Sequence, residues 1–256
     1  MGLAGAPWGS VIAIAVRFIY LFWRFNEEKI NGFVAGFSVV SQASIKTHLD
    51  EVVPIVANFI VLLTGQMLFQ VLFAQLPVQS YAAITLILPW IKIASMFVNS
   101  WAQSSTIFVS QFIGKGDYKA IPPFVLQSRL IATLMSILMV FAFYAFSQAI
   151  PYIYTNLSAE TLTALAIMTP AYIFIPLFRT NNMFCGNMVR AMGESYLIVR
   201  INIITMWVIS LPLCAFLIYL DAPLVVVFGV IFFDEILKSY PFRKTLFRKL
   251  DSYAKL

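Results

Sequence analysis

A row of polar side chains repeats at helical spacing inside an otherwise apolar stretch. Lys92, Ser95, Asn99, Gln103 and Thr106 follow one another at increments of 3, 4, 4 and 3 residues. At about 100° per residue, these side chains share one narrow face of a helix. An unpaired polar group that faces lipid costs several kcal/mol, so the row must face a neighbouring helix or a wet cavity. We predict that it lines a cavity; hydrogen bonding between helices is the alternative.

Lys92 stands far from either end of its apolar stretch, so its ammonium group cannot easily reach the interface. An ionisable residue inside a membrane is a functional candidate by default. The Asp and Glu residues stand at the ends of the apolar stretches rather than in their middles. We therefore expect Lys92 to be the deepest ionisable group. Its partner would come from helices outside this set or from an anionic substrate.

Other candidates for the cavity lie in two further stretches. Gln66 and Gln70 stand one helical turn apart, and Asn58 precedes them in the same stretch. Arg179 stands where its guanidinium group can reach the interface, so an anchoring role is the alternative for it. The complete set of substrate-cavity candidates is Lys92, Ser95, Asn99, Gln103, Asn58, Gln66, Gln70 and Arg179.

Motifs for catalysis or metal binding are missing from the sequence. It contains no phosphate-binding GxxxxGK[ST] loop, no GxSxG or HExxH motif and no Cys/His cluster. The two cysteines, Cys185 and Cys214, have no paired spacing, and His48 is the single histidine. We expect no catalytic residues, no metal, no cofactor and no enzymatic activity.

Seven apolar runs of roughly 20 residues must position these side chains, and each can cross a hydrocarbon core of about 30 Å. The chain is 61% hydrophobic and 11% charged, against about 25% charged residues in soluble domains. These features predict an all-α integral membrane protein with seven transmembrane helices. The runs begin near Gly2, Val52, Tyr81, Phe124, Thr161, Ser195 and Pro223.

Lys and Arg residues collect on alternate connections between the runs. The connections at 24–46, 115–119 and 190–200 and the segment 238–255 are basic, whereas those at 75–80, 150–160 and 220–223 contain no Lys or Arg. Cytoplasmic loops retain positive charge, so the N-terminus is expected outside and the C-terminus in the cytoplasm of a multi-pass cell (inner) membrane protein. A basic segment beside a membrane typically contacts anionic lipid headgroups, so we expect lipid partners and no nucleic acid.

Four segments resemble the multidrug and toxic compound extrusion (MATE) family of transporters. "VSQFIGKGDYKA" (109–120) and "GNMVRAMGES" (186–195) are similar to two loops of its C-terminal lobe. "GLAGAPWGSVIA" resembles the entry to the last helix of its N-terminal lobe, and "EVVPIVAN" the start of its seventh helix. In these loops, Gly114 and Gly116 are expected to allow a tight turn, and Asp117 and Glu194 to cap helix starts.

The resemblance covers helices six to twelve of a twelve-helix protein. It implies that residues 1–24 are the last helix of an otherwise missing N-terminal lobe, which would be a partner of this chain. Residues 25–50 would form a cytoplasmic amphipathic linker, residues 51–238 a six-helix C-terminal lobe and residues 239–256 a basic cytoplasmic tail.

The resemblance also implies secondary-active efflux of drugs or metabolites by alternating access, coupled as antiport to a proton or sodium gradient. One branch of the family has acidic cation ligands on its seventh and tenth helices. The corresponding positions here are Leu62 and Arg179, so no coupling site is visible in this lobe. A flippase for lipid-linked saccharides from the same superfamily is the alternative, and a seven-span receptor is a more distant one.

Overall fold

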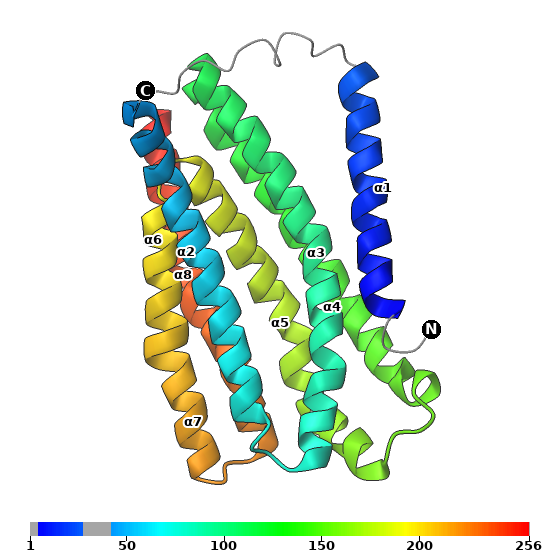
Figure 1. The fold of residues 1–256 in the computed structure, drawn as a ribbon. Helices are drawn as coiled ribbons and strands as arrows, with labels where there is room; N and C mark the ends of the chain where they lie inside the picture. The colour runs from blue at the N-terminus through cyan, green and yellow to red at the C-terminus, as the bar shows by residue number, and fades with distance from the viewer. Residues whose placement is uncertain (1–4, 28–41, 256) are drawn as a thin grey trace. The chain divides into compact units, whose positions relative to one another are not determined.

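Residues 5–27 and 42–255 are described by the computed structural model, and every element in these two ranges is helical (Figure 1). Two compact units, Met1–Leu49 and Asp50–Leu256, divide the chain. Each helix has the following bounds: α1 (Gly5–Glu27), α2 (Gln42–Phe73), α3 (Val78–Lys115), η2 (Tyr118–Ala120), α4 (Ile121–Ile153), α5 (Ala159–Ala191), α6 (Ser195–Asn202), η3 (Ile203–Ser210), α7 (Leu211–Tyr219) and α8 (Leu224–Ala254).

The predicted fold class, an all-α integral membrane protein, is confirmed. Within the described residues, five helical segments are long and apolar enough to cross a membrane. They are Val52–Phe73, Val78–Lys115, Tyr118–Ile153, Ala159–Ala191 and Ser195–Tyr219. The last of these joins α6, η3 and α7 into one helix, of which η3 is the π-helical middle part. Helix α8 is 31 residues long but carries several charged side chains, which lower its hydropathy.

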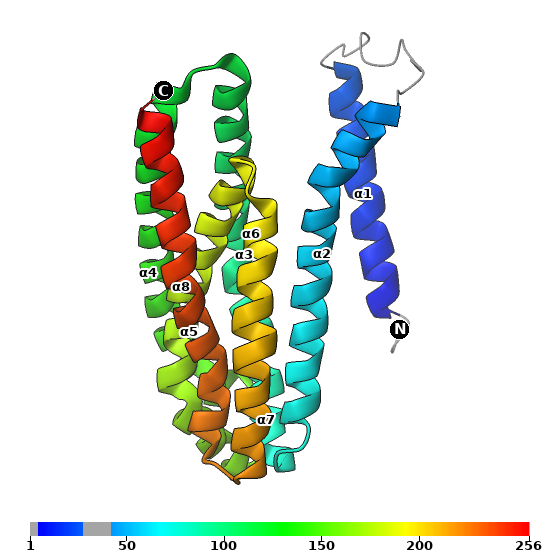
Figure 2. The same ribbon diagram turned by 90° about the vertical axis from the view of Figure 1, so that its left-hand side faces the viewer.

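The connections of the second unit lie at two opposite ends (Figures 1 and 2). The turns after α3 and α5 lie at the end that also holds the C-terminus, whereas the connections at 74–77, 154–158 and 220–223 lie at the other end. Gly116 (φ 72°) and Gly193 (φ 84°) provide the left-handed backbone that each of these two turns requires. Gly114 instead continues α3.

Two apolar clusters are stacked along the helices of the second unit. The first cluster takes residues 83–94 of α3, 164–175 of α5 and 227–230 of α8, and the second takes 98–109, 184–192 and 242–250 of the same helices. Buried polar side chains occupy the level between them. We call this level the polar layer; it consists of Asn58, Ser95, Ser136, Thr180, Asn182, Asn202, Thr205, Asp234, Glu235 and Lys238.

Two predicted segment boundaries fall inside helices of the structure. The basic tail was expected to begin at residue 239, but α8 continues without a break to Ala254. Phe242, Leu246 and Leu250 are buried in the second apolar cluster, and this burial explains why the helix extends through a basic sequence. The predicted linker at 25–50 lies mostly outside the described residues, and α2 already begins at Gln42.

Candidate functional site: a polar cavity in the helical unit

One cavity of about 320 Å³ opens among the helices of the second unit. Its size falls at the lower end of the range typical of small-molecule sites. Helices α2, α3, α5, α6, η3 and α8 all contribute to its wall. The polar and charged lining residues are Asn58, Gln66, Gln70, Lys92, Asn99, Gln103, Arg179, Asn182, Asn187, Arg190, Asn202, Asp234, Glu235 and Lys238.

The structure brings together seven of the eight substrate-cavity candidates. Asn58, Gln66 and Gln70 of α2, Lys92, Asn99 and Gln103 of α3, and Arg179 of α5 all line this cavity. Ser95 does not line it, because its side chain is buried and its hydroxyl donates to the Ile91 carbonyl oxygen at 2.7 Å. It stays a prediction that these seven side chains contact a substrate.

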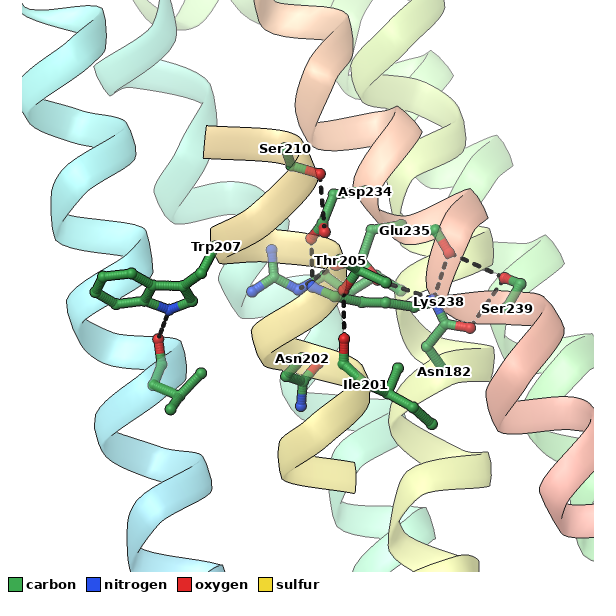
Figure 3. Close-up of polar contacts among 12 residues, drawn as sticks. Asn182, Ile201, Asn202, Thr205, Trp207, Ser210, Asp234, Glu235, Lys238 and Ser239 are labelled. Atoms are coloured by element: carbon green, nitrogen blue, oxygen red, sulfur yellow. Dashed lines mark hydrogen bonds and ion pairs between the residues drawn. The ribbon is translucent and has the colours of Figure 1, made fainter. Parts of the chain in front are cut away.

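Helix α8 carries a buried ion pair into this cavity. Asp234 and Lys238 stand one turn apart, and Lys238 Nζ donates to Asp234 Oδ2. The other carboxylate oxygen, Oδ1, accepts a hydrogen bond of 3.1 Å from the Ser210 hydroxyl of η3 (Figure 3). Both partners of the pair are only 4% exposed, so each charge depends on the other for compensation.

The neighbouring residue Glu235 joins α8 to α5. Asn182 Nδ2 donates both to Glu235 Oε2 at 3.0 Å and to the Glu235 carbonyl oxygen at 2.7 Å. Arg179 Nε lies 3.9 Å from Glu235 Oε1. The Ser239 hydroxyl donates to Asn182 Oδ1 at 2.9 Å, so both the nitrogen and the oxygen of the Asn182 side-chain amide are hydrogen-bonded (Figure 3). These contacts fix the α5–α8 seam at the level of the polar layer.

The expectation that carboxylates stand only at the ends of apolar stretches is wrong for α8. Since α8 begins at Leu224, Asp234 lies about 15 Å along it, half of a hydrocarbon core. That Lys92 is the deepest ionisable group stays a prediction. Asp234 and Lys238 are buried, whereas Lys92 is exposed. The signal that could have found them is the spacing of Asp234 and Lys238, which places opposite charges one turn apart after ten apolar or small residues.

The seam between α2 and the π-helical segment is close and polar. Asn202 Nδ2 donates to Asn58 Oδ1 at 2.7 Å. Trp207 Nε1 donates to the Val61 carbonyl oxygen at 3.1 Å (Figure 3). A Cβ atom on Gly65 would lie 2.1 Å from Met206 Sδ, so glycine is what allows this approach. Short π-helical segments inside longer helices frequently mark functional sites.

A weaker contact joins α3 to α5 across the cavity wall. Asn187 Nδ2 donates to Asn99 Oδ1 at 3.4 Å, so Asn99 of the polar row is directed at α5. Two turns earlier on α5, the buried hydroxyl of Thr180 is hydrogen-bonded to that of Ser136 on α4. Buried polar groups in an apolar bundle are retained where they are satisfied by one another, and this layer meets that condition.

An all-helical membrane bundle with a charged cavity at the level of its polar layer defines the class of polytopic transport proteins. The MatE family model matches residues 54–216, well over half of the chain, and the chain belongs to this family. Members of the family are transporters rather than enzymes. A comparison with curated proteins found no match for this chain.

Proposed function

We propose that this protein is a secondary-active exporter that moves small organic molecules out of the cell through the cavity of its second unit. The observation that carries the proposal is a cavity of about 320 Å³ whose wall holds a buried charged network in a MatE-family chain. Ionisable groups buried at membrane depth are costly, so proteins keep them where ions or polar substrates pass. The proposal places the chain in the inner cell membrane, with the C-terminus in the cytoplasm.

Protons are the coupling ion that the charge arrangement favours over sodium. A sodium site needs several oxygen ligands and no competing cation beside them. Here Lys238 is bonded to Asp234, and Arg179 lies 3.9 Å from Glu235, so each carboxylate already has a cation beside it. A proton needs only one carboxylate oxygen. We assign the proton to Asp234, because its protonation would weaken both the ion pair with Lys238 and the hydrogen bond from Ser210 of η3.

Protonation of Asp234 would change how α8 and η3 are joined. A neutral carboxyl group no longer attracts the Lys238 ammonium, and the charge-assisted bonds to its oxygens weaken. The α8–η3 contact would then loosen while the α5–α8 contact through Asn182 and Glu235 remains. Alternating access also requires a second body across the cavity against which these helices move, and the proposal includes one.

The test is uphill transport by cells that express the gene encoding this chain, or by membrane vesicles prepared from such cells. An imposed pH gradient should drive accumulation of a fluorescent drug in inside-out vesicles, and a sodium gradient of equal size should not. Asp234→Asn should abolish uphill accumulation yet retain exchange of substrate at equal concentrations. Glu160→Gln, an exposed carboxylate outside this cavity, is the matched control and should transport normally. Sodium-driven transport, or unimpaired uphill transport by Asp234→Asn, would overturn this coupling scheme.

A further inference from the structure

We propose that the cavity binds an amphiphile with an anionic head (a carboxylate, sulfonate or phosphate) and that Lys92 and Arg190 are the cations that contact this head. The inference rests on the proposed function and names the substrate class of the same site. Its basis is the distribution of charge over the lining residues.

Positive charge exceeds negative charge on the described cavity wall. The cationic lining residues are Lys92, Arg179, Arg190 and Lys238, and the anionic ones are Asp234 and Glu235. Lys238 is paired with Asp234 and Arg179 with Glu235. Within the part of the chain that the structure describes, no carboxylate lies within 4.0 Å of Lys92 or Arg190. The surplus therefore resides on these two side chains.

A cationic cargo would meet carboxylates that already have an internal cation beside them. Both oxygens of Asp234 accept hydrogen bonds, from Ser210 and from Lys238, while Glu235 Oε2 accepts one from Asn182 and Oε1 lies 3.9 Å from Arg179. Such a cargo would compete with Lys238 or Arg179 for the negative charge. An anion displaces only water from Lys92 or Arg190. In a cavity of low polarizability, that difference is larger than in water.

The Asn99–Asn187 contact locates the two cations along the cavity. Lys92 precedes Asn99 by two helical turns on α3, and Arg190 follows Asn187 by about one turn on α5. Both helices start at the end whose connections contain no Lys or Arg, so they run in the same direction. At 1.5 Å per residue, the ten residues of combined offset separate Lys92 and Arg190 by about 15 Å along the axis. One head group therefore contacts only one of these cations at a time, and neutral amides such as Gln103 line the wall between the two positions.

The remainder of the lining is apolar, which explains why an amphiphile fits better than a small inorganic anion. Aromatic and aliphatic side chains enter the cavity from opposite walls. On α2 they are Phe59, Leu62, Phe69 and Phe73, and on α5, η3 and α8 they are Met183, Met206, Ile231 and Phe242. An apolar ring system can be buried against these side chains while its head group reaches a cation.

The test is the binding of three fluorescent probes that share one xanthene ring system to the full chain in phosphatidylcholine nanodiscs. One probe carries a carboxylate, one its neutral amide and one an amine. The carboxylate should bind tightest, and the double variant Lys92→Gln/Arg190→Gln should weaken it about tenfold, with the neutral probe changed by less than about twofold. Lys92→Arg should retain carboxylate binding. Lys115→Gln, at the exposed end of α3 outside the cavity, is the control.

Tighter binding of the amine, equal binding of all three probes or carboxylate binding unchanged in the double Gln variant would overturn the inference. Binding is measured without a gradient, so any of these results leaves uphill transport to be judged separately. A second arm identifies the source of the anion. If phosphatidylglycerol added to the nanodiscs displaces the carboxylate probe, the anion that the cavity takes is a lipid head group; if not, it is a soluble anion.

Discussion

Asp234 and Lys238 show how burial controls the role of a charged pair. At the surface such a pair contributes at most about 1 kcal/mol, because water screens both charges. Here both side chains are only 5–6% exposed, so removal of one partner leaves the other desolvated and uncompensated. Ser210 supplies one further hydrogen bond to Asp234 but no charge. Replacement of both residues together is therefore expected to destabilise the fold less than replacement of either one alone.

We expect Lys238→Met to lower the free energy of unfolding by about 3 to 5 kcal/mol, because it leaves the Asp234 carboxylate buried without a cation. The double variant Asp234→Asn/Lys238→Met should recover most of this loss. Thermal unfolding of the purified chain in detergent measures both effects. If the double variant is as unstable as the sum of the single variants, the two side chains do not act as a pair.

The polar cavity was predictable from the sequence where polar residues repeat on one helical face. The row from Lys92 to Gln103 has that spacing, and three of its members line the cavity. Ser95 does not line it, and spacing alone does not reveal that a serine can donate to its own helix backbone. Asp234 and Glu235 were missed because the adjacent basic segment made their position look like the end of a span.

Among the elements, the π-helical segment η3 contacts two neighbouring helices close to the polar layer. Its residues contact α2 through Met206 and Trp207 and α8 through Ser210. A π-helical segment lies between Asn202 and Ser210 here, and both of these residues reach polar partners. No pattern of hydropathy marks such a segment, so the sequence predicts only one uninterrupted helix from Ser195.

Gly65→Ala should destabilise the α2–η3 seam by about 1 to 3 kcal/mol, because the new methyl group overlaps Met206 Sδ. In a Met206→Ala background the same change should be neutral or slightly stabilising, since alanine is the better helix former. Gly114→Ala is the control, because a Cβ atom there meets nothing within 4 Å. Detergent thermal melts of the four α2–η3 variants test this; equal effects in both backgrounds would show that the seam is not closely packed.

At the scale of the second unit, apolar and charged residues divide along the helix axis. Apolar clusters lie above and below the polar layer, and the basic side chains gather at the end that holds the turns after α3 and α5. The opposite connections contain no Lys or Arg. Hydropathy and charge bias were sufficient to predict this arrangement, because both result from transfer of single side chains between water and lipid. The contacts within the polar layer depend on helix packing and were not predictable in this way.

The charge bias predicts on which side of the membrane each end of the unit lies. Cysteines introduced at Gln75 and Asn156 should react with a membrane-impermeant maleimide in intact cells. Cysteines at Lys119 and Lys255 should react only after permeabilisation, because the basic end is retained in the cytoplasm. All four positions are exposed, and the native Cys185 and Cys214 are buried, so background labelling should be low. Labelling of Lys119→Cys and Gln75→Cys from the same side would contradict a spanning α3 and, with it, a cavity that can open to either side.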